Sequence, residues 1–268
     1  MSQSLSLKQL NVIVLPPIVF GALMLAVWYL SIYLFNIPDY QLPAPHQIVE
    51  AGMEESSTLW SGTLQTALAC VIGFMTSAII GAVLSLALAS SRWAYNGIYP
   101  YVLILKMTPV IVLAPIITLS FGQGLTSITI ITFLICFFPI VANTTMGLIT
   151  IDKNLEDLFK VYQASARQKL INLQIPNAMP YYLTGLKIAA ALTPIGALYG
   201  DTIAGMGSGD KAGLGFVVVI FSTQLKIPAL YAAAFTACTI GFVFVGFVSW
   251  LHWWLLHNWH NSYSLKDD

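Results

Sequence analysis

Charged residues are scarce in this sequence. Only 8% of its 268 residues are Asp, Glu, Lys or Arg, whereas an average soluble domain carries about 25%. A water-soluble globule with so few charges would expose large apolar patches and aggregate. Hydrophobic residues make up 57% of the chain, and mean hydropathy is +0.79. The composition excludes a soluble enzyme, a disordered chain and a secreted disulfide scaffold, and it predicts a polytopic protein of the lipid bilayer.

Net positive charge and cysteine are also in short supply. The 11 basic and 11 acidic residues cancel, so no positive field attracts nucleic acid. The three cysteines, Cys70, Cys136 and Cys238, lie scattered in apolar stretches and are interpreted as small hydrophobic residues. We therefore expect neither a nucleic-acid partner nor a disulfide or metal framework.

Long stretches without charge mark the membrane spans. A helix needs about 20 apolar residues to cross a hydrocarbon core of about 30 Å, and these stretches lack the alternation of a barrel strand. The first is too long for a signal-peptide core and should stay attached. We predict one all-α transmembrane domain over residues 1–268, with six helices at about 12–35, 62–90, 98–120, 126–148, 181–204 and 229–256.

The second span carries small residues at every fourth position: Gly73, Ser77, Gly81, Ser85 and Ala89. Such a stripe lets a neighbouring helix approach closely. We favour packing within the chain as its role.

The distribution of Lys and Arg predicts the orientation. Six spans place both termini on one side, and the loops and tails of that side hold Lys8, Arg92, Lys153, Lys160, Arg167, Lys169 and Lys266. The opposite loops hold only Lys211 and Lys226. Positive residues accumulate on the cytoplasmic side, so both termini are expected in the cytoplasm.

The loop between the fourth and fifth spans, about residues 150–180, is far longer than the other cytoplasmic connections. Apolar residues recur in it at helical spacing, and Pro176 and Pro180 mark the return to the membrane. This pattern predicts two short helices joined near residues 163–165. A short amphipathic helix can dock into a groove of a partner protein or lie on lipid, and the residues alone leave both possibilities open.

This loop resembles the cytoplasmic EAA motif of ABC importer permeases. The motif's Glu, Gly, Ile, Leu and Pro correspond, with no gap in spacing, to Asp157, Gln163, Leu173, Ile175 and Pro176. Further stretches resemble signatures of the same family, at residues 42–45, 108–109, 113–115, 121–124, 137–139, 143–144, 185–189 and 213–215. The resemblance is greatest to permeases of the nitrate, sulfonate and taurine type, which include importers of thiamine-precursor pyrimidines and flavins.

The resemblance implies a type I ABC importer permease fold in the bacterial cytoplasmic (inner) membrane. Two copies of the chain would form the pathway as a homodimer, separate ATPase subunits would bind ATP and Mg, and an external binding protein would deliver substrate. The chain itself would bind no cofactor. In agreement, the glycine cluster at residues 205–212 lacks the last Gly and the Ser or Thr of a phosphate loop.

The resemblance also implies roles for individual residues. Transmission of ATPase closure would involve the cytoplasmic loop, with ATPase-coupling residues Asp157, Phe159, Gln163, Ala164, Ser165, Arg167 and Pro176. Phe159 and Gln163 stand where the family usually has Ala and Gly, which suggests a co-adapted ATPase. Alternating access would follow from the different affinities of the two arrangements for ATP and substrate.

The third span is the best candidate to line the pathway. Pro109 and Pro115 free backbone carbonyls at membrane depth, and such carbonyls are tolerated where they face a cavity or another helix. Thr108 adds a hydroxyl nearby, and Asn143 is a candidate from the fourth span. Asp201, near the outer end of the fifth span, has three possible roles: an external gate or structural pair, lining of the pathway, or an interfacial position.

Two other function classes remain to be weighed. An ATP-independent secondary transporter or channel would not need the long loop with EAA spacing. An intramembrane enzyme would need a catalytic constellation, and the histidines cluster at one interface, away from Asp201. His252, His257 and His260 could conceivably hold a metal, but they stand among Trp and Tyr residues typical of a membrane-interface belt.

Overall fold

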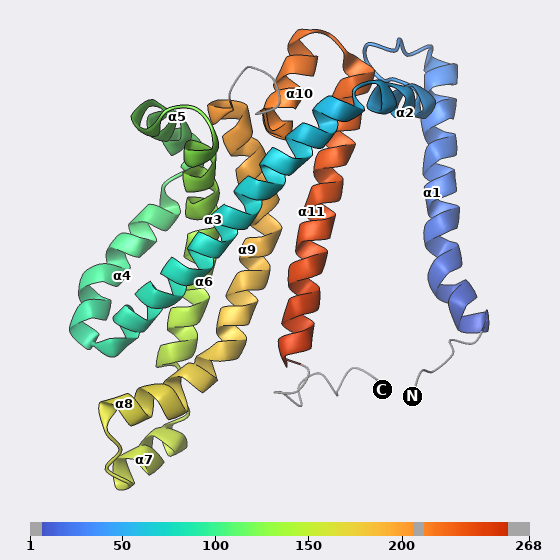
Figure 1. The fold of residues 1–268 in the computed structure, drawn as a ribbon. Coiled ribbons are helices and arrows are strands. Elements are labelled where there is room, and N and C mark those ends of the chain that lie inside the picture. Colours follow the sequence, from blue (N-terminus) through green and yellow to red (C-terminus); the bar gives the residue numbers. More distant parts are fainter. Residues whose placement is uncertain (1–6, 206–211, 257–268) are drawn as a thin grey trace.

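The computed structural model describes residues 7–205 and 212–256, and this part of the chain is all-helical, as predicted (Figure 1). The N-terminal half contains α1 (Leu7–Phe35), α2 (Pro45–Glu54), α3 (Ser56–Ser90), α4 (Arg92–Met107), α5 (Val110–Phe121) and α6 (Leu125–Ile149). The C-terminal half contains α7 (Lys153–Val161), α8 (Ala166–Lys169), the π-helical turn η1 (Leu170–Gln174), α9 (Ile175–Ala204), α10 (Leu214–Thr223) and α11 (Ile227–Leu256).

Within the described ranges, five helical segments are long and apolar enough to cross a membrane, and α4 with α5 makes a sixth span if the bent pair counts as one. The prediction of one continuous third span over residues 98–120 was wrong, because its two halves meet at 96°. Pro109 lacks an N–H and also pushes Thr108 out of the helical region, to φ −71° and ψ 121°. The sequence therefore breaks the helix at residues 108–109.

The fifth span begins earlier than the predicted residue 181. Helix runs without a gap from α8 through η1 into α9, so Pro176 and Pro180 do not end it. Pro176 lies in the first turn of α9, where a missing N–H costs little. The second helix of the loop at residues 150–180 and the fifth span are thus one continuous element.

The centre of the bundle is formed by α3, α6 and α9, which pack side by side (Figure 1). The small-residue stripe of α3 faces α6: a Cβ on Gly73 would lie 2.7 Å from the Thr132 side chain, and the Ser77 hydroxyl donates to the Phe133 carbonyl at 2.9 Å. This confirms the prediction of close packing within the chain.

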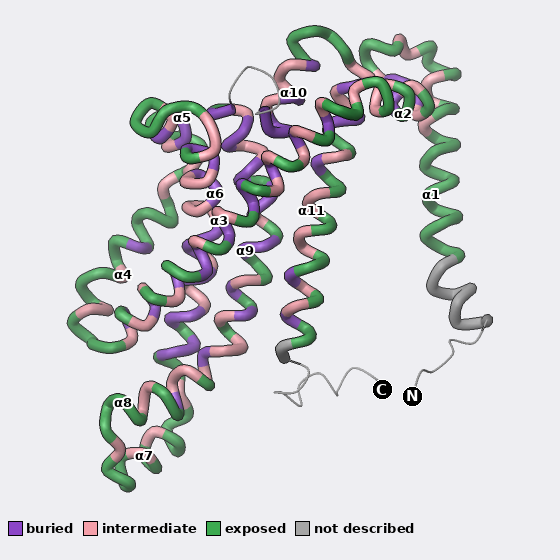
Figure 2. Tube along the Cα trace, viewed as in Figure 1, coloured by how far each residue is buried: buried purple, intermediate pink, exposed green. Residues whose placement is uncertain are grey.

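Helix α1 stands apart from this bundle. Figure 2 shows its exposed residues along its described length, and its most apolar window is 0% buried. Near the end of α1, the Trp28 indole N–H donates to the Pro43 carbonyl at 3.2 Å, and the ring lies 6.5 Å from that of Tyr231. These contacts join α1 to the rest of the protein near its C-terminal end.

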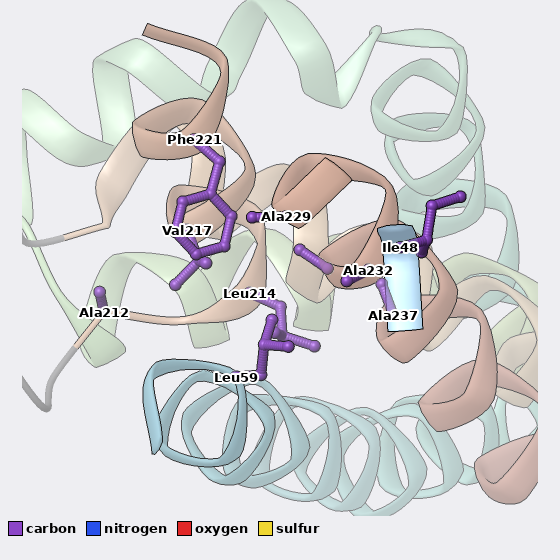
Figure 3. Packing of buried hydrophobic residues seen from close by; sticks show 10 residues of the cluster. Ile48, Leu59, Ala212, Leu214, Val217, Phe221, Ala229, Ala232 and Ala237 are labelled. Carbon is purple, nitrogen blue, oxygen red and sulfur yellow. The ribbon is translucent and has the colours of Figure 1, made fainter. Parts of the chain in front are cut away.

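The bundle has two different ends. Helices α7 and α8 form a helical hairpin at one end of the bundle, which we call the hairpin end, and the start of α1 and the end of α11 lie at the same end (Figure 1). The opposite end, which we call the far end, carries α2, α5 and α10. At the far end, a buried apolar cluster joins α2, α3, α10 and α11, and Figure 3 shows Leu59 of α3 beside Leu214 of α10. The sequence analysis did not predict α2 and α10. Residues 206–211 of the glycine cluster, and His257 and His260, lie outside the described residues.

Candidate functional site

Local capping devices form the first arm of the hairpin. The Asp152 carboxylate accepts from the Asn154 N–H at 2.7 Å and begins α7. At the other end, the Ala164 N–H donates to the Phe159 carbonyl at 3.0 Å and the Gln163 N–H to the Lys160 carbonyl at 2.9 Å. These two bonds form a Schellman motif. Gln163 has φ +50°, the left-handed conformation that favours glycine, which gives a physical reason for the Gly of the EAA motif.

The second arm starts with a reciprocal cap. The Ser165 N–H donates to Gln168 Oε1 at 2.8 Å, and the Gln168 N–H donates to Ser165 Oγ at 3.3 Å, so two backbone donors of the helix start are satisfied. The chain then continues from α8 into η1 and α9.

One ion pair connects the two arms. Lys169 Nζ lies 2.7 Å from Glu156 Oε1, and this hydrogen bond and charge lower the pKa of Glu156. Lys160 Nζ pairs within α7 with Asp157 Oδ1 at 2.9 Å, and the hydrogen bond from Lys160 to Asp157 raises the pKa of Lys160. The first pair therefore fixes the angle between the arms, whereas the second supports a single helix.

The two arms enclose a pocket of about 240 Å³ lined by Leu158, Phe159, Tyr162, Ala164, Gln168 and Asn172. Two predicted coupling residues, Phe159 and Ala164, meet in it. Asp157, Ser165 and Arg167 are exposed on the same hairpin, whereas Pro176 lies beyond it in α9. This arrangement displays both apolar and charged groups, as a protein-docking surface does.

Side-chain hydrogen bonds fix the base of the hairpin to the bundle. Asn177, in the first turn of α9, donates through Nδ2 to the carbonyls of Gly147 and Thr150, both at 2.8 Å. These carbonyls belong to the end of α6, where helical donors run out. A force on the hairpin therefore reaches both α9 and α6.

Asp201 lies at the far end of α9 and is 1% exposed. Thr66 of α3 donates its hydroxyl to Asp201 Oδ2 at 2.6 Å, and the Gly215 N–H of α10 also donates to the carboxylate. The Thr66 hydroxyl in turn accepts from the Leu214 N–H at 2.9 Å. The carboxylate thus holds the positive N-terminal end of α10 and joins three helices.

Two glycines make this approach possible. A Cβ on Gly213 would overlap the Asp201 carboxylate, and a Cβ on Gly215 would overlap the Leu198 carbonyl. The Gly213-Leu214-Gly215 sequence, which resembled a family signature, therefore has a steric explanation in this structure.

The remaining predicted pathway residues do not form one cluster. Thr108 and Pro109 lie at the break between α4 and α5, and Pro115 is exposed on α5. Asn143 instead lies at the contact between α6 and α9, where its Nδ2 donates to the Pro139 carbonyl at 2.7 Å and its Cβ faces Gly185.

Three features of these sites were not predicted from the sequence: Thr66, the Glu156–Lys169 pair and Asn177. Thr66 is one hydroxyl among several in an apolar span, so no local pattern marks it. Within the described residues, no group of three or more His, Cys, Asp or Glu side chains could hold a metal ion.

Comparison with known proteins identifies the family to which the chain belongs. The family described as "Binding-protein-dependent transport system inner membrane component" matches residues 78–255. The formylaminopyrimidine transport permease protein ThiX of Halalkalibacterium halodurans is 34% identical over 85% of this chain and 89% of its own. The riboflavin transport system permease protein RibX of Chloroflexus aurantiacus is 32% identical over 81% of this chain and 80% of its own.

A nitrate import permease protein, NrtB of Synechocystis, is 24% identical over 89% of this chain and 88% of its own. The family match covers more than half of the chain, and it agrees with the EAA-like spacing of the hairpin. The chain belongs to the inner-membrane components of binding-protein-dependent transport systems: it is a multi-pass permease subunit of an ABC importer and not its ATPase.

Proposed function

We propose that the α7–α8 hairpin is the coupling element of this importer and that an ATPase subunit binds it in the cytoplasm. The observation that carries the proposal is the unbroken helix from α8 through η1 to the far end of α9. A rigid element of this kind transmits a displacement without absorbing it in a loop. In this proposal both chain termini are cytoplasmic, since the start of α1 and the end of α11 lie on the hairpin side of a six-span chain (Figure 1).

The coupling residues fall into three groups. Phe159 and Ala164 line the hairpin pocket and receive apolar groups of the ATPase. Asp157, Ser165 and Arg167 are exposed and form polar contacts around it. Gln163 shapes the turn, and Pro176 starts the span. The whole unit, residues 150–180, belongs to a single permease domain covering residues 1–268.

The pathway runs along the broken span. Pro109 and Pro115 are exposed, and Thr108 lies at the break itself. A pathway along this exposed surface needs a second protein surface to enclose it, and in this proposal a second identical copy supplies that surface, as in a homodimer. Asn143 lies behind the pathway, and Asp201 acts as part of the external gate by holding α10 to α3 and α9.

Two relatives above 30% identity, which are named for formylaminopyrimidine and riboflavin, support a proposal on the substrate class. We infer that this permease transports a nitrogen heterocycle of the thiamine-precursor or flavin kind, rather than nitrate or a sulfonate. The external binding protein performs most of the selection. ATP and Mg bind only to the ATPase.

The test is charge reversal on the hairpin. Arg167→Glu should reduce co-purification of the ATPase, and ATP-driven uptake of formylaminopyrimidine or riboflavin into proteoliposomes, by roughly tenfold or more. Thermal unfolding should not change, because Arg167 is exposed. The matched control is Arg92→Glu, an exposed arginine outside the hairpin. Full ATPase recovery with Arg167→Glu would refute the coupling role, and uptake of nitrate alone would refute the substrate class.

A further inference from the structure

The broken span contains a backbone carbonyl that its own helix cannot satisfy. In an α-helix the carbonyl of residue 111 accepts from the N–H of residue 115. Residue 115 of α5 is proline, which has no N–H. The Ile111 carbonyl therefore requires a donor from elsewhere.

That donor comes from α9. The Tyr199 hydroxyl donates to the Ile111 carbonyl at 3.1 Å. The Tyr199 ring packs against the apolar cluster formed by Ala114 and Ile117 of α5 with Ile131 of α6. The contact therefore combines a directional bond with apolar packing, and it joins segments 88 residues apart in the sequence.

A second bond joins the other end of α5 to the same helix. The Gly124 N–H, just beyond α5, donates to the Ala204 carbonyl at 2.6 Å. Ala204 is the last residue of α9, so its carbonyl has no helical partner. The last two turns of α9 thus hold α5 near its start and just beyond its end, whereas α5 is separated from α4 by the 96° break at Thr108–Pro109.

We propose that Tyr199 is a positioning residue that fastens α5 to α9, so that α5 follows α9 and swings relative to α4 about Thr108–Pro109. This rests on the proposed function, because it extends the mechanical connection from the hairpin to the exposed prolines of the pathway. The hairpin moves α9, α9 carries α5, and the break at residues 108–109 absorbs the change in angle.

The experiment measures distances between spin labels in the complete permease–ATPase complex in lipid nanodiscs. All variants carry Cys238→Ser, because Cys238 is the exposed native cysteine among the described residues. One pair, at Leu119 and Ile195, reports on α5 relative to α9; the other, at Leu119 and Tyr101, reports on α5 relative to α4. All three positions are more than half exposed. Distances are recorded without nucleotide and with ATP plus vanadate.

With Tyr199 present, the 119–195 pair should show one narrow distance in both states, and the 119–101 distance should shift with ATP plus vanadate. Tyr199→Phe should broaden the 119–195 distribution or add a second population. The matched control is Tyr182→Phe, in the same helix. Tyr182 donates to the Ala78 carbonyl at 3.4 Å, and that carbonyl lies inside the uninterrupted α3 and keeps its helical donor, so the distribution should stay narrow.

A double variant distinguishes the positioning of α5 against α9 from a general effect on the thermal stability of the protein. Pro115→Ala returns an N–H to position 115, so the Ile111 carbonyl can bond within α5. In Tyr199→Phe/Pro115→Ala, any loss of thermal stability should be recovered while the 119–195 distribution stays broad. A narrow distribution in both Tyr199→Phe variants would overturn the inference. If the 119–101 distance does not shift with ATP plus vanadate while Tyr199 is present, the swing of α5 about residues 108–109 is overturned, whereas the proposed function is overturned by full ATPase recovery with Arg167→Glu.

Discussion

The two ends of this permease are stabilised by contacts of different range. At the hairpin end, the ion pair that joins the arms connects residues 13 apart, Glu156 and Lys169, and the caps act within a few residues. At the far end, Thr66 connects to Asp201 across 135 residues and to Leu214 across 148. The hairpin is thus a locally built unit displayed to solvent, whereas the far end exists only when distant helices meet.

This difference suits the two roles that we propose for these ends, ATPase docking at the hairpin and an external gate at Asp201. A docking element benefits from a shape of its own, because less order has to be gained on binding. An external gate must instead respond to changes in the relative positions of several spans. A buried carboxylate of α9 that accepts hydrogen bonds from α3 and α10 depends on those positions. Substitution of a buried polar residue should therefore destabilise the far end, whereas substitutions in the hairpin should act only on the hairpin.

The largest loss of stability is expected on substitution of Asp201. Asp201→Ala leaves two buried donors, the Thr66 hydroxyl and the Gly215 N–H, without their acceptor. At about 1–3 kcal/mol for each orphaned donor, the loss of stability should be about 2–6 kcal/mol. Thermal unfolding of the purified protein in detergent measures it.

Two variants make this measurement specific. Asp201→Asn keeps one acceptor oxygen and should lose less. Asp157→Ala removes an exposed carboxylate of the hairpin end and should leave the unfolding temperature unchanged. Equal losses at Asp157 and Asp201 would show that the two ends do not differ in this way.

The same contrast explains how much could be predicted from the sequence. The spans and the two helices of the hairpin were predictable, because charge gaps and helical spacing are local patterns; the coupling role of the hairpin residues stays a prediction. The break at Thr108–Pro109 was missed because proline within an apolar run is compatible with either a kinked or a broken helix. Thr66 and Tyr199 carry no local signal, since their partners lie 135 and 88 residues away.

An intermediate effect is expected at the left-handed residues that end α7 and α10. Gln163 at the hairpin end has φ +50° and Leu225 at the far end has φ +57°, and each is the C′ residue of a Schellman motif. This conformation costs a non-glycine residue about 1–2 kcal/mol. Gln163→Gly and Leu225→Gly should therefore each stabilise their own helix end by about 1 kcal/mol.

Amide hydrogen exchange of α7 and α10 measures both gains. The β-branched Gln163→Val and Leu225→Val are the opposing variants and should accelerate exchange. Because the strain is local, the two ends should respond alike here, unlike their response at Asp201 and Asp157. Slower exchange throughout the bundle, rather than near the substituted turn, would contradict this local origin.

The smallest change in stability is expected on loss of the ion pair between the hairpin arms. Lys169 lowers the pKa of Glu156 in the folded hairpin, so the pair stabilises the hairpin at pH above the ordinary Glu pKa of about 4.3. That contribution is lost as the pH falls through the lowered pKa. Spin labels at Val161 and Ile171, both exposed, should give a narrow distance at pH 7 that broadens below about pH 4.

Two substitutions assign this broadening to the correct carboxylate. Glu156→Gln should be broad at every pH, since its amide carries no charge for Lys169. Asp157→Asn should retain the pH-dependent change, because Asp157 pairs with Lys160 inside α7 and does not connect the arms. A distance that stayed narrow at every pH in Glu156→Gln would assign the angle between the arms to the packing of Phe159 and Ala164, and a pH response that persisted in this variant would assign it to another carboxylate.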